Sequence, residues 1–577
     1  MVKYVLGISC FYHDSAACLI KDGKIIAAAQ EERFTRKKHD PRFPKNAVAY
    51  CLKEGGIAAK DLAYVAFYEK PLLKFERLIS QHIQMFPRSL WSFYKAMPSW
   101  INEKLRIPSI VRKELKYDGN VLFIEHHLAH AASAFLVSPF KEAAILTVDG
   151  VGEWATATYG YGKENEITLL KEQKFPHSIG LLYSAVTGYL GFKVNNDEYK
   201  VMGLAPYGKP NYVDQFKKIV KIHDDGSIEL DMSYFVFHYR TKMYNKKFEE
   251  LLGPSRKPES EVNQRHKDIA KSLQVVLEES YFKMLNHLHK ETKMRNLCVA
   301  GGVALNSVAN GKILDNTKFE DIFIQPAAGD AGGAMGAALY AYNTLLGNKR
   351  EEILEHAYWG PSFSHEEIKK FLDDNKINYK KYGEKEMVQK TAELIYKNNV
   401  VGWFQGRMEW GPRALGARSI LSNATNPQMK DILNLKVKHR EAFRPFAPVC
   451  PLEDAKKFFD IKLHDPFMLF VCQVKKGWGE KLPSITHIDN SARLQTHVRE
   501  INHRYYDVMK EFEKLSGIPV LINTSFNIRG EPIVCTPYDA YRCMMGTGID
   551  YLVMDTFIIA RADNPQDMWD SEHLAKD

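Results

Sequence analysis

The stretch VKYVLGISCFYHDSAACLIKDGKIIAAAQEER at residues 2–33 decides the fold of this chain. It predicts a strand, a polar turn and two further strands, with Asp22-Gly23 as the turn of a hairpin. The same pattern returns from residue 143, in AAILTVDGVGE, WATATYGYG and ITLLKEQKF. In both copies a strand ends in Gly or Asp-Gly and a hairpin follows, which indicates an internal duplication of one structural unit.

Two duplicated lobes with glycine-rich turns between them are also how actin, Hsp70 and the sugar kinases hold a nucleotide. We therefore expect an α/β chain whose N-terminal domain, residues 1–355, has this architecture. Charge, glycine and proline mix in GNKREEILEHAYWGPSFSHEE, which favours a boundary there. Residues 356–577 contain the strand-like segments VVGWFQG, FMLFVCQV and PVLINTSF, and are expected to form a second α/β domain.

Composition describes an ordinary globular protein of 577 residues, 45% hydrophobic and 26% charged. A net charge of +9 fits anionic substrates as well as nucleic acid, and we expect no nucleic-acid partner. The eight cysteines include no CxxC pair and lie mostly in apolar runs, so we expect reduced thiols in a cytoplasmic protein. The segment MVKYVLGIS is expected to be a strand, not a signal peptide, and no run of 18 apolar residues predicts a membrane span.

The segment HHLAHAASAF at 126–135 carries the strongest chemical signal. His126 and His130, four residues apart, would lie on one face of a helix. Asp149 and Asp330 each follow a short apolar run and adjoin glycine, as expected at a strand end that opens into a site. Two nitrogens and two oxygens suit a divalent metal that also holds a phosphate oxygen. The alternative is a histidine pair at a helix start, satisfied by backbone carbonyls.

Glycine-rich segments indicate a nucleotide site. GGVALN at 301–306 follows a predicted strand, so backbone amides could approach a phosphate closely, although paired glycines are also common in plain tight turns. GDAGGAMG and DGVGE extend the set, and EYKVMGLAPYGKP offers a lysine that binds phosphate or is merely solvated. The candidate nucleotide-binding residues are Gly301, Gly302, Asn306, Gly332, Gly333 and Lys200.

The C-terminal half concentrates arginine and lysine beside apolar residues, in GRMEWGPRALGARSIL and LKVKHREAFRPFAPV. Half-buried guanidinium groups need anions, which favours a pocket for phosphate or carboxylate over an idle basic surface. Side chains in NSARLQTH and NTSFNIRGEP could complete the pocket. The basic residues are Arg407, Arg413, Arg418, Lys436, Lys438, Arg440, Arg444 and Arg493, and the polar ones are Asn523 and Ser525.

Two further features leave alternatives open. His13, in FYHDSA, could be a general base, although a lone histidine in a turn is often only hydrogen-bonded. Residues 72–116 carry Trp91, Phe93, Tyr94 and Trp100 among lysines and arginines. Such a stretch forms an interfacial helix, a lid over the acceptor, or amphipathic helices that pack on their domain. We expect packing on the domain and no membrane contact.

These motifs together resemble the NodU/CmcH-type O-carbamoyltransferases. The matching segments are GISCFYHDSAACLI, EERFTRKKHD, HHLAHAASAF, TVDGVGEW, YKVMGLAPYG, GGVALN, GDAGGAMGAAL, GRMEWGPRALGARSI, FRPFAPV and NTSFNIRGEPIV. They run in order from residue 7 to about residue 534, nearly the whole chain. The resemblance implies an N-terminal domain similar to the ATPase that makes threonylcarbamoyladenosine on tRNA, and a C-terminal domain similar to YrdC.

The resemblance also implies a reaction. Carbamoyl phosphate is cleaved in the YrdC-like domain, its carbamate reacts with ATP to give carbamoyl adenylate, and a hydroxyl of a small-molecule acceptor then takes the carbamoyl group. His126, His130, Asp149 and Asp330 would bind the metal, expected to be iron(II), with manganese or zinc as alternatives and magnesium accompanying ATP. The glycine loops and Asn306 would bind adenosine. His13 would be the base, with His39 near the same pocket, and Lys438, Arg444, Arg493 and Ser525 would hold carbamoyl phosphate, the first two as catalytic groups.

Two other functions remain open at this point. A tRNA-modifying threonylcarbamoyl-type transferase could be built from the same two folds, and would need a continuous basic surface. A non-catalytic ATP-driven binding protein of the Hsp70 or actin kind would leave the histidine pair and the arginines without purpose. The sequence leaves open which hydroxylated compound is the acceptor, which metal is native, and whether the protein is a monomer or a homodimer.

Overall fold

The computed structural model describes residues 3–438, 441 and 443–565. The chain forms two compact units. The first unit contains residues 1–31 and 39–354, and the second contains residues 32–38 and 355–577. No helix among the described residues is long and apolar enough to cross a membrane. The eight cysteines are free thiols, and all except Cys472 are buried.

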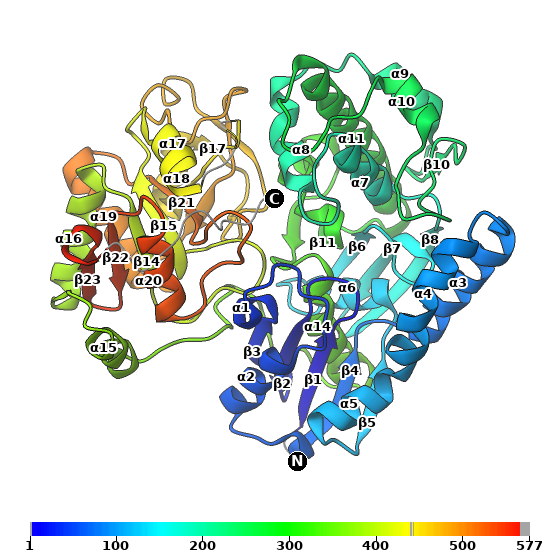
Figure 1. The fold of residues 1–577 in the computed structure, drawn as a ribbon, viewed down its shortest axis with the longest axis horizontal. Coiled ribbons are helices and arrows are strands. Elements are labelled where there is room, and N and C mark those ends of the chain that lie inside the picture. The colour runs from blue at the N-terminus through cyan, green and yellow to red at the C-terminus, as the bar shows by residue number, and fades with distance from the viewer. Residues whose placement is uncertain (1–2, 439–440, 442, 566–577) are drawn as a thin grey trace. The chain divides into compact units, whose positions relative to one another are not determined.

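The first sheet of unit 1 is a meander of three strands extended by two parallel strands (Figure 1). Strand β1 pairs antiparallel with β2 and parallel with β4, β2 pairs antiparallel with β3, and β4 pairs parallel with β5. Both Asp22 and Gly23 adopt positive φ, as the predicted hairpin turn requires. The strands are β1 (Tyr4–Ser9), β2 (Ala16–Lys21), β3 (Lys24–Gln30), β4 (Leu62–Phe67) and β5 (Asn120–Phe123).

The second sheet of unit 1 repeats this arrangement, strand for strand. Strand β6 pairs antiparallel with β7 and parallel with β11, β7 pairs antiparallel with β8, and β11 pairs parallel with β12. The order β8-β7-β6-β11-β12 therefore matches β3-β2-β1-β4-β5, so the predicted duplication is present in the topology. The strands are β6 (Glu142–Val148), β7 (Ala155–Lys163), β8 (Glu166–Lys174), β11 (Asn296–Ala300) and β12 (Asp321–Ile324).

Helices α6 (His126–Phe135) and α14 (Asp330–Leu339) pack against each other between the two sheets of unit 1 (Figure 1). Their backbones touch: a Cβ added at Gly336 would lie 1.8 Å from the carbonyl oxygen of Ala129. Strand β1 approaches α14 as closely, because a Cβ added at Gly7 would lie 1.8 Å from the carbonyl oxygen of Ala334. Glycine at these positions is a steric requirement of the packing.

The other elements of unit 1 cover the sheets or fill connections. Helix α2 packs on β2 and β3, and the long α11, which the apolar period at 262–292 predicts, begins after Asn263 and packs on β6 and β7. The elements are α2 (Lys45–Gly55), α3 (Pro71–Met85), α4 (Leu90–Asn102), α5 (Ile107–Leu115), α7 (Ile179–Tyr189), α8 (Glu198–Leu204), α9 (Val213–Ile219), β9 (Val220–Ile222), β10 (Ile228–Leu230), α10 (Lys246–Leu252), α11 (Gln264–Thr292), α12 (Ser307–Asn310) and α13 (Ile313–Asn316).

Unit 2 is built on an eight-stranded sheet of order β13-β23-β22-β14-β15-β21-β16-β20, with a separate three-stranded sheet, β17-β18-β19. The predicted strands VVGWFQG and PVLINTSF supply β14 and β21. The strands are β13 (Lys380–Lys381), β14 (Val401–Phe404), β15 (Arg418–Asn423), β16 (Ala447–Pro451), β17 (Phe459–Asp460), β18 (Cys472–Val474), β19 (Ser491–Ala492), β20 (Gln495–His497), β21 (Leu521–Ser525), β22 (Tyr551–Met554) and β23 (Phe557–Ala560).

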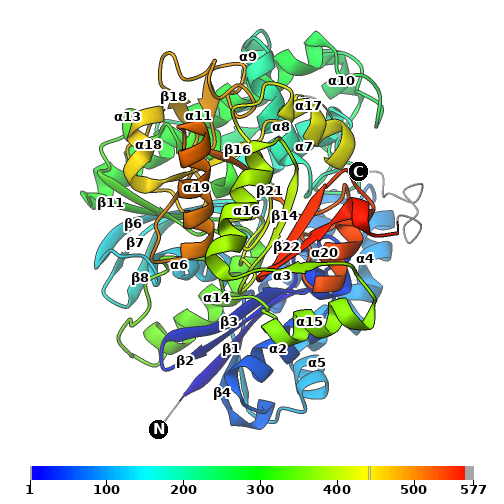
Figure 2. The same cartoon turned by 90° about the vertical axis from the view of Figure 1, so that its left-hand side faces the viewer.

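Helices cover both faces of the large sheet of unit 2 (Figure 2). Alternate residues of each strand face opposite cores, so Trp403 packs with α16 and α19, whereas Phe404 packs on the other face, with α15 and α20. The helices are α15 (His365–Asp374), α16 (Glu384–Tyr396), α17 (Met429–Ile432), α18 (Leu452–Phe458), α19 (His503–Ser516) and α20 (Pro537–Met545). The α/β class expected for this half of the chain is confirmed.

One predicted strand of unit 2 is much shorter than expected. FMLFVCQV is extended only at its end, in β18, although Phe467, Met468 and Leu469 are buried. The buried carboxylate of Asp465 accepts hydrogen bonds from the backbone N–H groups of Phe467, Leu469 and Phe470, which turns the chain away from a ladder. An apolar run in the sequence does not show that a neighbouring carboxylate will bind these backbone N–H groups in place of an adjacent strand.

The segment 32–38, which the sequence-based boundary places in the N-terminal domain, belongs to unit 2 and begins with α1 (Glu32–Thr35). Arg33 donates to the carbonyl oxygen of Gly411 at 2.8 Å, and Arg36 donates to those of Pro532 and Ile533 at 2.7 Å. Phe34 packs against Met408 and Ile533. These long-range partners are invisible to a boundary drawn from local composition.

The α6–α14 contact gives a stability prediction. Replacing Gly336 by Ala forces the two backbones apart, and overpacking of this kind costs about 2–3 kcal/mol. Denaturant unfolding followed by circular dichroism should show that loss. Gly329→Ala is the matched control, because a Cβ there meets nothing within 4 Å. Equal stability of the two variants would contradict the packing.

Candidate active site

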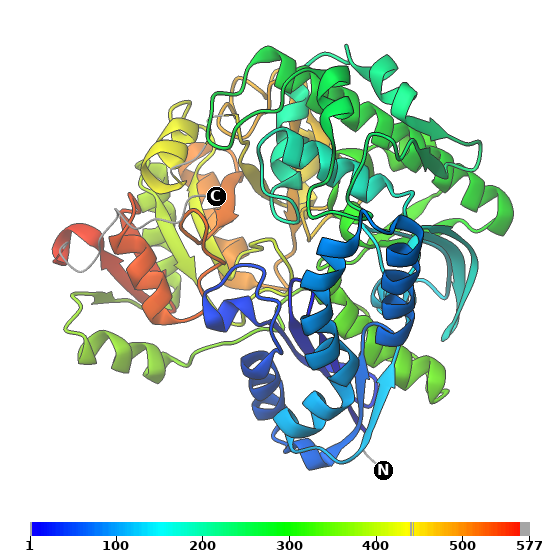
Figure 3. The same cartoon turned by 45° about the vertical axis from the view of Figure 1, so that its right-hand side comes forward.

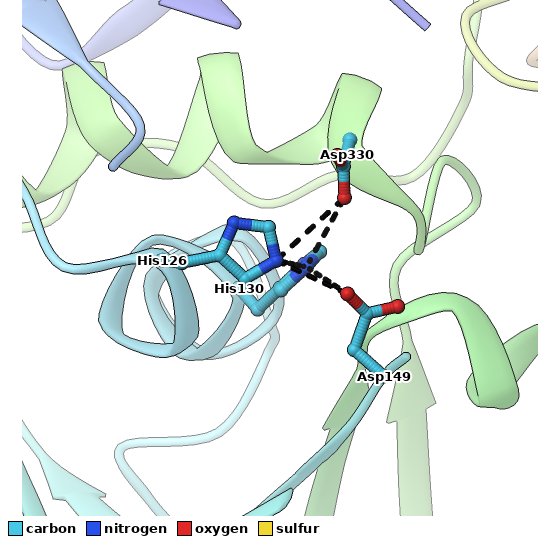
Figure 4. A group of neighbouring side chains, drawn as sticks. All are labelled: His126, His130, Asp149 and Asp330. Carbon is cyan, nitrogen blue, oxygen red and sulfur yellow. Dashed lines mark hydrogen bonds and ion pairs between the residues drawn. The ribbon is translucent and has the colours of Figure 1, made fainter. Parts of the chain in front are cut away.

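Helix α6 places two imidazoles one turn apart. His126 is its first residue and His130 follows on the same face, with both side chains buried (Figure 4). The backbone N–H of His126 donates to both carboxylate oxygens of Glu153, at 3.1 and 3.2 Å. A negative group at this position stabilises the helix start and satisfies an N–H group that the helix leaves without a partner. The helix therefore holds the histidine pair at a fixed, buried end.

Two carboxylates face the histidines from other elements (Figure 4). Asp149 directly follows β6, and Asp330 is the first residue of α14. The Nε2 atom of His126 lies 3.1 Å from Oδ2 of Asp149 and 3.6 Å from Oδ1 of Asp330. The Nε2 atom of His130 lies 3.9 Å from each of these oxygens and 3.1 Å from Nε2 of His126. The four residues proposed from spacing thus meet.

This geometry fits a divalent ion. Two atoms that bind one ion at ~2.1 Å lie about 3.0–3.5 Å apart in octahedral or tetrahedral shells, close to the distances seen here. The four candidate ligand atoms all lie within 4.8 Å of one another. Within the described chain, the Nδ1 atoms of His126 and His130 are buried without hydrogen-bond partners, so each ring makes its polar contacts through Nε2. Nitrogen and carboxylate donors suit iron, manganese or zinc.

Burial and neighbouring charges shift the pKa values of the four side chains in different directions. Burial lowers the pKa of His130 well below its usual range, and a charge on His126 adds to the effect. Burial opposes ionisation of Asp149, but the hydrogen bond from His126 holds the pKa of its carboxyl well below the ordinary value. Burial raises the pKa of Asp330. The shifts favour a neutral His130 and an ionised Asp149, the forms that bind a metal. Burial opposes a charge on His126, but the carboxylates of Asp330 and Asp149 together outweigh it and raise the pKa of that imidazole.

His13 lies beside this cluster. Its Nε2 atom is 3.8 Å from Oδ2 of Asp330, and its Nδ1 atom donates to Oδ2 of Asp14 at 2.9 Å. Asp14 also accepts from Nδ1 of His39 at 2.6 Å, and Nε2 of His39 faces Oδ1 of Asn196 at 2.7 Å. His39 therefore lies near the same pocket, as expected, and acts on His13 through the shared carboxylate.

Sequence reasoning missed several partners of these residues. Asp14 orients His13, Glu153 caps α6, and the hydroxyl of Tyr68 donates to Asp330 at 3.4 Å. The sequence could have pointed to two of these partners. Asp14 directly follows His13 in FYHDSA, and Glu153 shares the segment DGVGE with Asp149. Tyr68 gave no local signal, because β4 brings it to the site from a distant part of the sequence.

The glycines proposed for nucleotide binding lie in two places, the turn after β11 and the helix α14. Gly301 follows β11 with φ of 93°, and the N–H of Gly302 donates to Oδ1 of Asp149 at 3.0 Å, so this turn borders the cluster. Asn306 caps the short α12 and exchanges side-chain hydrogen bonds with Gln274, at 3.0 and 3.1 Å. The turn lies where the sequence placed it, and the amide of Asn306 is engaged with its own unit.

Gly332, Gly333 and Lys200 are not in loops, contrary to expectation. Both glycines are inside α14, where a Cβ at Gly332 would lie 2.2 Å from the carbonyl oxygen of Ala327 and one at Gly333 would lie 2.8 Å from Tyr68. Lys200 is buried in α8 with its ammonium 3.1 Å from Asp197. Close helix packing accounts for glycine at positions 332 and 333, and the ion pair with Asp197 accounts for the buried lysine at position 200.

In unit 2, strand β21 gathers part of the predicted anion pocket. The buried ammonium of Lys438 donates to the carbonyl oxygen of Ser525 and, at 2.8 Å, to the side chain of Asn527. Asn523 donates to the carbonyl oxygen of Ala414 at 3.1 Å and to Gln495 at 2.8 Å. These contacts bring the segments that carry Arg413 and Arg493 to the same strand. Asn527 is a partner that the sequence did not single out.

Three of the proposed arginines of unit 2 have different kinds of partner. Arg444 lies 3.3 Å from Glu441, while Arg440 falls outside the described residues. Arg407 and Arg418 donate to backbone carbonyl oxygens, including those of Trp359 and Gln405, both at 2.9 Å. The guanidinium of Arg418 also lies 3.7 Å from the centroid of the Phe404 ring. Backbone carbonyl oxygens therefore supply part of the hydrogen bonding of these two arginines, and the expectation that they bind an anion stays a prediction.

Comparison with known proteins identifies the family. Residues 4–339 match the model of the carbamoyltransferase N-terminus, and residues 392–561 match that of the carbamoyltransferase C-terminus. The chain belongs to the carbamoyltransferase family and is a carbamoyltransferase enzyme. An uncharacterized protein of Synechocystis sp. is 49% identical over 98% of each chain. Nodulation protein NolNO of Sinorhizobium fredii is 38% identical over 96% of this chain and 80% of its own.

Solved structures resemble the chain only loosely. Component A of (R)-2-hydroxyglutaryl-CoA dehydratase from Acidaminococcus fermentans matches 60% of this chain and 99% of its own, with a TM-score of 0.31 and 15% identity. HypF of T. kodakarensis matches 60% of this chain and 48% of its own, with a TM-score of 0.31 and 14% identity.

The cluster on α6 predicts metal loss on substitution. His130→Gln should weaken binding of a divalent ion at least about 100-fold, because it removes a ligand where loss of an outer-shell partner alone costs 10–100-fold. Metal content after dialysis, measured by inductively coupled plasma mass spectrometry, checks this. His127→Gln is the matched control on the same helix. Its two nitrogens contact Thr147 at 2.6 Å and the carbonyl oxygen of Ala155 at 2.9 Å. Metal lost from the His127 variant and kept in the His130 variant would remove the pair from the ligand set.

Proposed function

We propose that this carbamoyltransferase is ATP-dependent and carbamoylates a hydroxyl group of a small-molecule acceptor. Water would hydrolyse carbamoyl phosphate to carbamate and phosphate, and the carbamate oxygen would attack the α-phosphorus of ATP and release pyrophosphate. The resulting carbamoyl adenylate would then donate its carbamoyl group. The observation that carries the proposal is the convergence of His126, His130, Asp149 and Asp330 beside His13. Family membership supports the carbamoyl group, and the cluster supports handling of phosphate charge.

The chemistry explains why a nucleotide is needed. Carbamate is a poor electrophile, because its carbon carries a negatively charged oxygen pair. Esterification to AMP removes that charge and supplies a good leaving group. In the transfer step the acceptor oxygen forms a bond to the carbamoyl carbon, the bond from that carbon to the AMP oxygen breaks, and AMP leaves with the electron pair. The hydroxyl proton must go to a base in the site.

The candidate ligands would hold the metal, iron(II) by family resemblance with manganese or zinc as alternatives, and a bound ion there would neutralise phosphate charge as AMP departs. The turn at Gly301 and Gly302 would bind the nucleotide next to it, with Asn306 on its flank. Gly332 and Gly333 would contribute by letting α14 pack closely rather than as a loop. The pairing of Lys200 with Asp197 favours a structural role for that lysine.

His13 would accept the acceptor's proton. Its Nδ1–H group donates to Asp14, which leaves Nε2 to take a proton from a hydroxyl. His39 holds the other oxygen of Asp14 and so fixes the carboxylate that orients His13. The hydrogen bond to Asp14 keeps the imidazole in one tautomer.

Unit 2 would bind and cleave carbamoyl phosphate in a YrdC-like fold. Lys438 and Arg444 would act on the phosphate, because a compact ammonium and a planar guanidinium together neutralise it. Side chains on β21 and on the segments near it would complete the pocket. They are Arg413, Arg493, Asn523 and Ser525. Arg444 would leave its ion pair with Glu441 and bind the incoming anion.

A partial-reaction assay tests the scheme. With carbamoyl phosphate and ATP alone the protein should release pyrophosphate, and adding hydroxylated metabolites should identify one that raises AMP release and becomes carbamoylated. His13→Asn should spare pyrophosphate release within about twofold and slow transfer at least about 100-fold, the usual contribution of a general base. If both halves of the reaction slow equally, His13 is not the base of the transfer step. No pyrophosphate release by the unaltered protein would refute the adenylate route.

Substitution of Arg444 tests for a separate carbamoyl phosphate pocket. Arg444→Ala should raise the KM for carbamoyl phosphate at least about tenfold, because a charge-assisted hydrogen bond to phosphate is worth ~1.5–3 kcal/mol, and should leave the KM for ATP unchanged. Arg499→Ala is the control in the same unit, since Arg499 is exposed and pairs with Asp507 at 2.8 Å. Equal rises for both substrates in the Arg444 variant would argue against two pockets.

A further inference from the structure

Helices α3 and α4 form a hairpin on the outside of unit 1 (Figure 3). This hairpin leaves large apolar side chains exposed. Trp91 is 67% exposed and Tyr94 is 71% exposed, whereas Trp100 of the same helix is only 7% exposed. The sequence led us to expect that these helices pack on their domain, and only one side of the hairpin does so. The exposed set is Leu72, Ile83, Phe86, Leu90, Trp91, Tyr94 and Ile101.

The inner side of the hairpin is firmly anchored, so the exposure is a property of the folded protein. Arg77 donates to the carbonyl oxygen of Gly152 at 2.9 Å, and the buried ammonium of Lys74 pairs with Glu69 at 2.5 Å. Ser92 donates to the carbonyl oxygen of Tyr239 at 2.8 Å. One face of α3 and α4 therefore belongs to unit 1, and the other meets solvent with its apolar residues outward.

The segment that contains the hairpin and the following α5 is strongly basic. Residues 70–116 contain ten lysines and arginines, three glutamates and no aspartate, a net charge of +7 within a chain of +9. Exposed cations lie directly among the aromatic rings. The ammonium of Lys95 is 5.0 Å from the centroid of the Trp91 ring, which stacks on Tyr94 at a centroid distance of 6.2 Å. Apolar and basic groups thus share one surface.

We propose that the α3–α4 hairpin docks on an anionic lipid surface. Amphipathic helices bind such surfaces by burying their apolar face at the boundary between headgroups and acyl chains, while lysine and arginine meet the lipid phosphates. Tryptophan and tyrosine favour that boundary because one end of each is apolar and the other polar. The exposed leucines, isoleucines and Phe86 supply the apolar contact, and Arg88 and Lys95 supply charge beside them.

Other occupants fit this surface less well. A second copy of the chain would bring the exposed Arg88 and Lys95 of the two surfaces face to face, and like charges repel each other. Nucleic acid would use the cations and the aromatic rings, but has no use for exposed Leu72, Ile83, Leu90 and Ile101. Docking on lipid uses the aliphatic, aromatic and cationic side chains together.

Vesicle flotation with the full-length protein tests the proposal. The protein should float with vesicles that contain phosphatidylglycerol, at least tenfold more than with pure phosphatidylcholine, and raised salt should release it. Trp91→Ser combined with Tyr94→Ser, and separately Lys95→Glu combined with Arg88→Glu, should each reduce the bound fraction at least tenfold. Leu170→Ser combined with Ile488→Ser is the control, because those residues are equally exposed but lie outside the hairpin.

Circular dichroism of each variant identifies any that fails to fold. Binding to anionic vesicles that the hairpin substitutions reduce and the control spares would support the proposal. No binding, equal binding to neutral vesicles, or equal loss in the control would overturn it. A concentration-dependent dimer that the Trp91 and Tyr94 substitutions abolish would assign the surface to a second copy, and binding of single-stranded RNA in place of vesicles would assign it to nucleic acid.

Discussion

The backbone contact between α6 and α14 is the constraint on which the first unit depends. Gly336 lets α14 lie against the carbonyl oxygen of Ala129, so the two helices approach more closely than any side chain would allow. Because His126 begins α6 and Asp330 begins α14, this contact also decides how the metal candidates face one another. Gly7 extends the same close packing to β1. Stability and the site are therefore set by one steric requirement.

The charges of the buried side chains determine how the cluster responds to substitution. Four titratable side chains meet in a buried place, where an isolated charge would be costly, and two imidazoles face two carboxylates there. Removal of any one leaves its partner buried and uncompensated, which makes the group behave as a unit. The second unit handles charge differently. There Arg407 and Arg418 donate hydrogen bonds to backbone carbonyl oxygens, and the buried ammonium of Lys438 donates to oxygens of Ser525 and Asn527.

Much of this could be predicted from the sequence. Periodicity and the Asp-Gly turn revealed the duplicated strands, and the spacing of His126 and His130, with two glycine-flanked aspartates, revealed the cluster. Features that depend on distant partners could not be predicted. Composition gives no reason for residues 32–38 to join the second unit, and the glycines of GDAGG serve helix packing that only the partner strand and helix explain. Apolar residues in an amphipathic pattern predicted burial, yet Trp91 and Tyr94 face solvent, because periodicity cannot tell a core from an unpartnered face.

The central claim is that α6 and α14 together hold one divalent ion. X-ray absorption spectroscopy of the protein loaded with manganese or iron(II) measures that shell directly. The account predicts about two imidazole nitrogens and at least two carboxylate oxygens at ~2.0–2.2 Å, with the imidazole scattering lost when His126 and His130 are both replaced by Gln. A shell of oxygens alone, unchanged by that double substitution, would contradict it.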